Sequence, residues 1–262
     1  MDVFFLTGAG TEPAQSIARR LVSAGSRVYG FDARFPEQGF QNADFIPVPL
    51  DMTDIAAVRT AASKILATET ILSGVIFAAG QTVEDPFEST HPDDISLALV
   101  SGLVAPLLLA RMALPSLVRC RGHIIAITND TPGQDGTVLN ATVAGALREF
   151  TRTLFEELRD TGTKTAHLRI GHNTGRTDPA ARTTQTPQSE VQPDIVADTV
   201  LTLLRLRENN ALTELVLRPQ ATRETPRLPV TADPRLRAIQ VVQLPLPQHF
   251  PPPDEAIYTP PR

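Results

Sequence analysis

The sequence predicts an α/β fold, a doubly wound parallel sheet of about seven strands with a proline-rich C-terminal extension. Short apolar runs alternate with longer segments of helical period as far as residue 218, which is the pattern of parallel strands joined by crossover helices. The first run, Val3 to Leu6, is apolar at every position, so helices should cover both faces of the sheet. Together the two observations favour a layered architecture.

The elements are expected in a regular order. Strands are predicted at residues 3–6, 27–31, 71–79, 123–128, 164–170 and 212–218. Helices are predicted at residues 14–22, 55–65, 94–118, 139–159 and 194–207. Pro13 is expected as the first helical residue, and Asp51 or Thr53 as the cap of the second helix. The helix at 94–118 has few charges and should be buried against a partner surface as well as against its own sheet.

The composition is that of a globular protein that does not bind nucleic acid. Hydrophobic residues make up 42% of the 262 residues and charged residues 20%, which is enough apolar material for a sizeable core. The formal net charge is −5 and the only lysines are Lys64 and Lys164, so no basic field is available for phosphate backbones.

Cysteine and histidine usage argues against disulfides and metal sites. Cys120 is the only cysteine, which excludes an intramolecular disulfide and favours a reducing compartment. The five histidines are too scattered for metal-ligand spacing. The N-terminus has no basic region and no run of 18 apolar residues occurs, so we expect neither a signal peptide nor a membrane span, and a cytoplasmic protein.

The composition changes near residue 221. Ten of the 42 residues from 221 to 262 are proline. We therefore expect one domain at 1–220 and an extended tail at 221–262. This tail is either a loosely ordered terminus or an arm that wraps a neighbouring subunit, since proline-rich chain loses little entropy on ordering.

A glycine-containing turn, Thr7-Gly8-Ala9-Gly10-Thr11-Glu12-Pro13-Ala14, joins the first strand to the first helix. Dinucleotide-binding folds place a pyrophosphate at this point against the N–H groups of the helix. Asp32 follows about 20 residues later, the spacing at which an acidic side chain reaches an adenosine ribose. The alternative is that Gly8 and Gly10 only form the turn and Asp32 only caps it.

Several further segments occur in a characteristic order. They are Leu50-Asp51-Met52-Thr53-Asp54, Ala78-Ala79-Gly80, Ala105-Pro106-Leu107-Leu108-Leu109, Leu114-Pro115, Gly122-His123-Ile124-Ile125 and the segment from Phe150 to Leu158. With the turn and Asp32, they make residues 3 to 218 resemble the short-chain dehydrogenase/reductase family, whose fold is Rossmann-like.

The resemblance implies an NAD site and an oligomer. By analogy with the family, Asp32 would select NAD by bonding the ribose hydroxyls, Asp51 would lie beside the adenine and Gly80 would let the backbone approach the cofactor. Thr7, Gly8 and Gly10 would belong to the phosphate turn. The family usually forms dimers or tetramers through its two long helices, here 94–118 and 139–159.

The family's catalytic residues have no counterparts at the matching positions. The tyrosine position is Asn140 and the lysine position is Ala144, and no Tyr-x-x-x-Lys pair occurs anywhere in the chain. The serine position falls on Thr128 or Asn129, and the asparagine position on Gly102. An amide does not release a proton near pH 7, so the usual proton relay is lost and no confident catalytic residue remains.

The phosphate turn also departs from the family. Glu12 and Ala14 stand at the second and third glycine positions. A carboxylate near a pyrophosphate would repel it by about 1 kcal/mol per charge in water at 4 Å, and by about 4 where solvent is partly excluded. NAD binding is therefore possible but doubtful. The milder interpretation is that Glu12 turns outward and caps the helix.

Other groups could carry a proton. His172 lies in the segment that would flank the nicotinamide, and Asp130 and Asp135 follow the strand predicted at 123–128. A lone polar residue on a loop is more often solvated than catalytic. The loop at 173–193, where the family sets substrate specificity, names no substrate.

Three functions fit these observations. The first is a non-catalytic subunit that forms a homo- or hetero-oligomer, for example with an active dehydrogenase relative, through helices 94–118 and 139–159. The second is an NAD-dependent oxidoreductase of unorthodox mechanism that acts on a small carbonyl or alcohol. The third is an NAD-sensing regulator. Neither a metal, nor nucleic acid, nor a membrane is expected as a partner.

Overall fold

A computed structural model describes residues 1–78, 83, 85–129, 137–171, 191–206 and 209–219. The chain divides into two units, residues 1–223 and 224–262. The described residues all belong to the first unit. The predicted tail at 221–262, together with Gly80, Asp130, Asp135 and His172, lies outside them.

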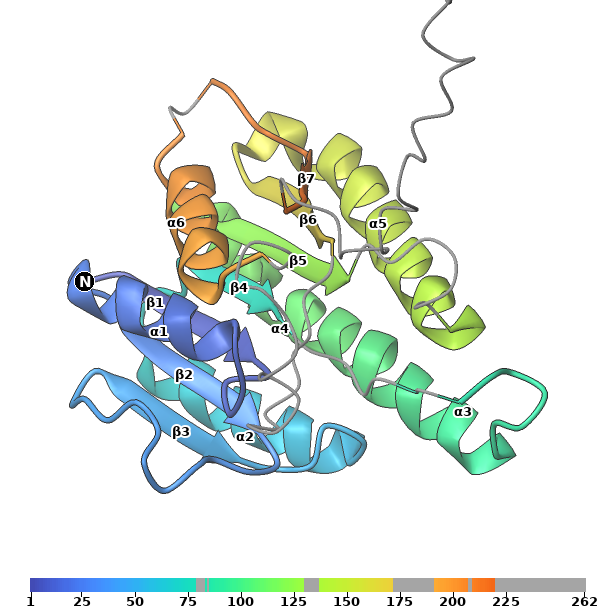
Figure 1. The fold of residues 1–262 in the computed structure, drawn as a ribbon. Helices are drawn as coiled ribbons and strands as arrows, with labels where there is room; N and C mark the ends of the chain where they lie inside the picture. Colours follow the sequence, from blue (N-terminus) through green and yellow to red (C-terminus); the bar gives the residue numbers. More distant parts are fainter. Residues whose placement is uncertain (79–82, 84, 130–136, 172–190, 207–208, 220–262) are drawn as a thin grey trace, which may run out of the picture. The chain divides into compact units, whose positions relative to one another are not determined.

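The first unit contains the predicted parallel sheet of seven strands, and the strand order is β3-β2-β1-β4-β5-β6-β7 (Figure 1). The strands are β1 (Val3–Thr7), β2 (Arg27–Asp32), β3 (Phe45–Pro49), β4 (Gly74–Phe77), β5 (His123–Asn129), β6 (Lys164–Ile170) and β7 (Glu214–Leu217). The helices are α1 (Ala14–Ser23), α2 (Ile55–Thr68), α3 (Pro92–Leu99), α4 (Ala105–Cys120), α5 (Val138–Leu158) and α6 (Pro193–Leu204).

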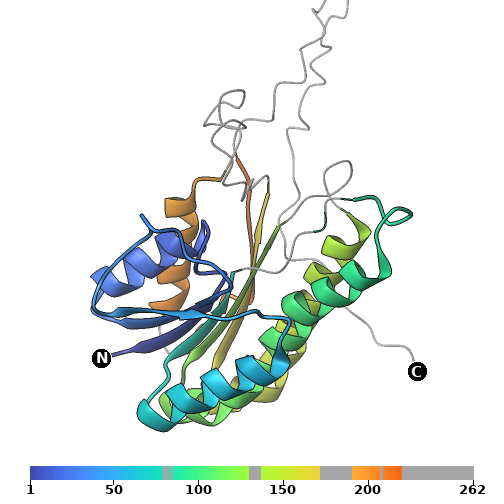
Figure 2. The same cartoon turned by 90° about the horizontal axis from the view of Figure 1, so that it is seen from below.

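The helices form one layer on each face of the sheet (Figure 2). Helices α1 and α6 pack on one face, where Ile17 and Val200 are fully buried against strand residues such as Leu6 and Leu168. Helices α2, α4 and α5 pack on the other face. The central strands are therefore covered on both sides, which explains why their sequences are continuously apolar.

Strand β3 is absent from the elements predicted by sequence. It carries Pro47 and Pro49, and a proline cannot donate a ladder hydrogen bond. The strand pairs only with β2, along one edge of the sheet, where the missing donors cost little. The two prolines made the segment look unlike a strand in the sequence, although an edge strand tolerates them.

Two helix starts differ from the sequence-based expectation. Helix α1 begins at Ala14, and Pro13 is the residue before it rather than the first helical residue. Helix α2 is capped by Asp54, whose Oδ1 accepts a hydrogen bond from the Ala57 N–H at 2.9 Å, and not by Asp51 or Thr53. Asp54 occupies the position immediately before the helix, the geometry that capping requires.

The predicted helix at 94–118 is a composite of three segments. Helix α3 runs into a π-helical segment, Val100–Val104, which continues directly into α4. Pro106 lies just after the π segment and lacks the N–H that a regular helix would need there.

One described helix, Pro92–Cys120, is long and apolar enough by composition to cross a membrane. Its apolar side chains, however, include the core residues Leu109, Ala113 and Leu117, which are fully buried against the sheet. The composition is that of a core helix of this fold.

Candidate active site

The candidate site lies where the strand order reverses, at the carboxyl ends of β1, β2 and β4. Strand β1 pairs with β2 on one side and with β4 on the other. The chain therefore adds β2 and β3 on one side of β1 and then crosses to add β4 to β7 on the other side. Open α/β sheets bind ligands in the crevice at this switch point. The sequence-predicted residues Thr7, Asp32 and Thr128 stand at or near the carboxyl ends of β1, β2 and β5.

The turn after β1 is folded back on the end of β2. Gly8 has a φ of 71°, a conformation that favours glycine. The N–H groups of Gly8 and Ala9 donate to the carbonyl oxygen of Phe31 at 2.9 and 3.3 Å. The Thr11 N–H donates to the Gly8 carbonyl at 3.1 Å.

Asp32 is bound to this turn. Its Oδ2 accepts a hydrogen bond from the Gly10 N–H at 3.0 Å, and its Oδ1 accepts one from the Arg34 N–H at 3.3 Å. A Cβ at Gly10 would lie 2.0 Å from the Arg34 carbonyl oxygen and 3.0 Å from the Asp32 Cγ. Glycine is thus required at position 10 by close backbone approach.

Glu12 caps helix α1. Its Oε2 accepts a hydrogen bond from the Ser16 N–H at 3.0 Å, and its Oε1 forms an ion pair with the Arg19 guanidinium at 2.5 Å. This is the capping arrangement that the sequence left as one of two interpretations. Ala14, the first residue of α1, is buried in the core.

Thr7 and Asp51 have local partners. The Thr7 side chain is buried, and its hydroxyl accepts a hydrogen bond from the Ala78 N–H at 3.3 Å, which links the ends of β1 and β4. The Asp51 carboxylate accepts hydrogen bonds from the N–H and the hydroxyl of Thr53, both at 2.8 Å. These bonds lower the pKa of Asp51, with the backbone N–H as the larger cause.

Asn140 is bonded to the segment that follows β4. Its Oδ1 accepts a hydrogen bond from the Val83 N–H at 3.1 Å, and its Nδ2 donates to the Val83 carbonyl at 2.9 Å. Thr137, the cap of α5, donates from its hydroxyl to the same carbonyl at 3.0 Å. Val83 in turn packs with Ala98 and Leu139 in a small separate core.

Thr128 pairs with a histidine that the sequence analysis did not consider. The Thr128 Oγ1 lies 2.9 Å from Nε2 of His167, which is 1% exposed on β6. No sequence signal distinguished His167, because Lys164, Thr165 and Arg169 of the same strand are polar as well. Asn129, the other residue at the predicted serine position, is exposed.

Ala144 and Gly102 occupy the two remaining predicted positions. Ala144 lies one turn after Asn140 on α5 and is half-buried, and Gly102 is buried within the π segment. Neither carries a functional group.

A family model for short chain dehydrogenases matches residues 2–185. The chain belongs to the short-chain dehydrogenase family. No curated protein matches the sequence significantly.

Solved structures of short-chain dehydrogenases share this fold. A metagenomic short-chain oxidoreductase in complex with NADP is 22% identical with a TM-score of 0.68, over 84% of this chain and 98% of that one. An alcohol dehydrogenase from the archaeon Thermococcus sibiricus, complexed with 5-hydroxy-NADP, is 22% identical with a TM-score of 0.72, over 86% and 99%. A short chain dehydrogenase from Leptospira borgpetersenii with bound NAD+ is 17% identical with a TM-score of 0.72, over 83% and 91%.

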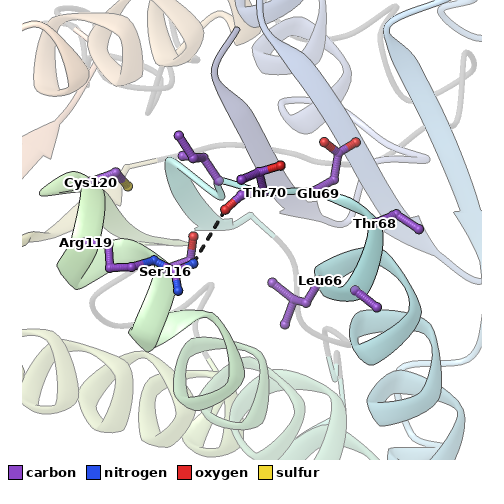
Figure 3. Close-up of a pocket in the computed structure, with 9 residues that line it drawn as sticks. Leu66, Thr68, Glu69, Thr70, Ser116, Arg119 and Cys120 are labelled. Carbon is purple, nitrogen blue, oxygen red and sulfur yellow. Dashed lines mark hydrogen bonds between the residues drawn. The ribbon is translucent and has the colours of Figure 1, made fainter.

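This short-chain dehydrogenase also has an open cavity of about 530 Å³ near the amino ends of β4 and β5, at the opposite end of the strands from the candidate site (Figure 3). The cavity lies between the ends of α2 and α4, and its lining includes Leu66, Glu69, Thr70, Ser116, Arg119 and Cys120. The Ser116 hydroxyl accepts a hydrogen bond from the Leu72 N–H at 2.8 Å, and Arg119 donates to the Thr70 carbonyl at 3.5 Å. Burial raises the pKa of the Cys120 thiol. None of the sequence-predicted site residues lines this cavity.

Glu69, at the rim of the same cavity, belongs to a polar cluster. Its Oε1 accepts hydrogen bonds from the Tyr29 hydroxyl at 2.6 Å and from Arg27 at 3.2 Å. Burial, followed by the bond to Glu69, raises the pKa of Tyr29 to about 12. The described residues contain no group of three acidic, cysteine or histidine side chains that could hold a metal ion.

Proposed function

We propose that this chain is a non-catalytic member of the short-chain dehydrogenase family that acts as a subunit of an oligomer. The observation that carries the proposal is the double hydrogen bond between Asn140 and the backbone of Val83. Both polar atoms of the Asn140 carboxamide are engaged, and the group has no proton to exchange near neutral pH. Asn140, at the family's tyrosine position, therefore has a structural role: it holds the backbone of Val83.

The absence of a lysine counterpart supports the same proposal. In the family a lysine four residues after the tyrosine lowers its pKa, whereas Ala144 carries neither charge nor reach. Replacing Asn140 with tyrosine would also remove the two hydrogen bonds to Val83, which is 7% exposed. Restoring one residue therefore does not restore the relay.

The outer face of the layer formed by α4 and α5 supports assembly. Val104, at the end of the π segment, is 45% exposed, and Val138, at the start of α5, is 58% exposed. Partly buried apolar side chains continue along both helices: Leu107, Leu108, Met112, Val143, Phe150 and Leu154. We propose that a second copy of this chain or an active relative covers this face, as expected for a soluble cytoplasmic oligomer.

Native mass spectrometry tests this assembly. The chain is expressed alone and together with an active short-chain dehydrogenase from the same genome, and the complexes are weighed. Val104→Glu should dissociate the oligomer, because it places a charge on the proposed interface. Ile195→Glu is the matched control, since Ile195 is 51% exposed on α6, on the other face of the sheet. A monomer under both conditions, or equal effects of the two substitutions, would refute the proposed assembly.

One observation favours a second candidate, an NAD-dependent oxidoreductase of unorthodox mechanism for a small carbonyl or alcohol. The Thr128 hydroxyl at 2.9 Å from the His167 imidazole is a pair that can exchange a proton. This candidate requires turnover of NADH or NAD+ with a carbonyl or alcohol panel. It also requires that Thr128→Val abolishes the turnover while the protein stays folded.

A further inference from the structure

We infer that Glu12 and Arg19 form an autoinhibitory contact that keeps the diphosphate of a dinucleotide away from the N-terminus of α1. The inference concerns nucleotide binding alone, so it holds whether the chain is catalytic or not. In this inference Glu12 both caps α1 and lowers the affinity of the chain for a dinucleotide.

The turn before α1 satisfies most of its own N–H donors within the chain. Of the nine N–H groups between Gly8 and Ile17, seven donate within the chain. At the start of α1, the Gln15 N–H donates to the Thr11 carbonyl at 3.0 Å and the Ser16 N–H to Glu12 at 3.0 Å. A helix N-terminus binds phosphate through free N–H groups, and here most are engaged.

The charge of Glu12 also opposes an anionic ligand at the N-terminus of α1. The Glu12 carboxylate occupies the positive end of the α1 dipole, so it fills the position that an anionic ligand would take. Its side chain is only one-third exposed, which limits screening by solvent. A phosphate at the same place would find the Ser16 N–H already bonded and would be repelled by the Glu12 carboxylate.

Arg19 binds both Glu12 and Ser16. Its Nη2 contacts the Glu12 Oε1 at 2.5 Å and donates to the Ser16 hydroxyl at 2.6 Å. The guanidinium thus lies beside the helix N-terminus with its charge directed at Glu12. Without the Glu12 charge, the same guanidinium becomes available to a phosphate.

The test is calorimetric titration of the full chain with NAD+. Glu12→Gln removes the charge but keeps an oxygen that can accept from Ser16, so the helix cap survives. We expect this variant to bind NAD+ about tenfold or more tightly than wild type. Glu149→Gln, an exposed glutamate on α5 that is also paired with an arginine, is the matched control and should bind as wild type does.

Arg19 provides a second readout. In the background of Glu12→Gln, the further change Arg19→Gln should reverse most of the gain, because the released cation is lost. Adenosine, which has the ribose and base but no phosphate, should bind wild type and Glu12→Gln equally.

Three results overturn the inference. The first is NAD+ affinity in Glu12→Gln within twofold of wild type, with an unchanged melting curve. The second is an equal gain in Glu149→Gln or for adenosine. The third is no NAD+ binding by Glu12→Gln or by a second variant, Glu12→Gly. None of them bears on the proposed assembly, which rests on the face of α4 and α5.

Discussion

The carboxamide of Asn140 holds the backbone of Val83 by two hydrogen bonds of 3.1 and 2.9 Å, across 57 positions of sequence. The pairing resembles one rung of a β-ladder made by a side chain. It holds Val83 against the start of α5.

Replacing Asn140 with alanine should destabilise the fold by about 1–3 kcal/mol, because the buried Val83 N–H loses its Asn140 acceptor and the Val83 carbonyl keeps only the bond from Thr137. The change is measured as the free energy of unfolding in urea. Thr142→Ala is a suitable control on the same helix, since Thr142 is exposed and bonds only the Val138 carbonyl. Equal effects of the two substitutions would show that the Val83 contact contributes nothing.

Two glycines should respond in opposite directions to alanine. Gly10→Ala places a Cβ 2.0 Å from the Arg34 carbonyl oxygen and should cost about 1–3 kcal/mol of stability. At Gly145, on α5, a Cβ meets nothing within 4 Å, and alanine should stabilise the helix by about 0.5–1 kcal/mol. Thermal unfolding of both variants measures the difference, and a stable Gly10→Ala protein would contradict the close approach of the turn to β2.

His123 should make the protein acid-sensitive. Burial, followed by the nearby Lys164 charge, lowers the pKa of His123 to about 4, whereas an unfolded histidine titrates near 6.5. Between those values the unfolded state binds a proton that the folded state does not. Stability therefore falls as the pH drops from about 6.5 to 4, by at most about 1.4 kcal/mol per pH unit.

Urea unfolding across this pH range measures the effect. His123→Gln should flatten the pH dependence, whereas His91→Asn should not, because His91 is exposed at the start of α3. An unchanged slope in His123→Gln would refute the assignment.

Tyr29 should resist ionisation. Its pKa of about 12 exceeds the usual value of about 10, so the folded state keeps its proton where the unfolded state loses it. Stability should then decline between pH 10 and 12. In Glu69→Gln the Tyr29 pKa should fall part of the way, since burial, the larger cause, remains. Ultraviolet absorbance during alkaline titration follows the phenolate directly. A Tyr29 pKa in Glu69→Gln equal to that of wild type would exclude the contact with Glu69.

The sequence predicted the layers and the strand type because periodicity reports burial directly. The runs at β1, β4 and β5 are apolar because helices cover both faces of these strands. Strand β3 escaped prediction since Pro47 and Pro49 are acceptable only at an edge, and edge position is a property of the whole sheet.

The site was predicted less completely, for a related reason. The positions of Thr7, Asp32 and Thr128 at strand ends follow from local pattern. The contacts of Asn140 with Val83, and of Thr128 with His167 across 39 positions, are set by packing between distant segments. No local signal specifies such partners.

Hydride transfer in a protein with bound nucleotide tests directly whether this chain is non-catalytic. Glu12→Gln, loaded with NADH at high protein concentration, is mixed with a panel of small carbonyl compounds, and the absorbance of NADH is followed. A non-catalytic chain predicts no loss of absorbance beyond that of NADH alone. Oxidation of NADH that depends on the carbonyl and disappears in Thr128→Val would contradict the account and establish the chain as an enzyme.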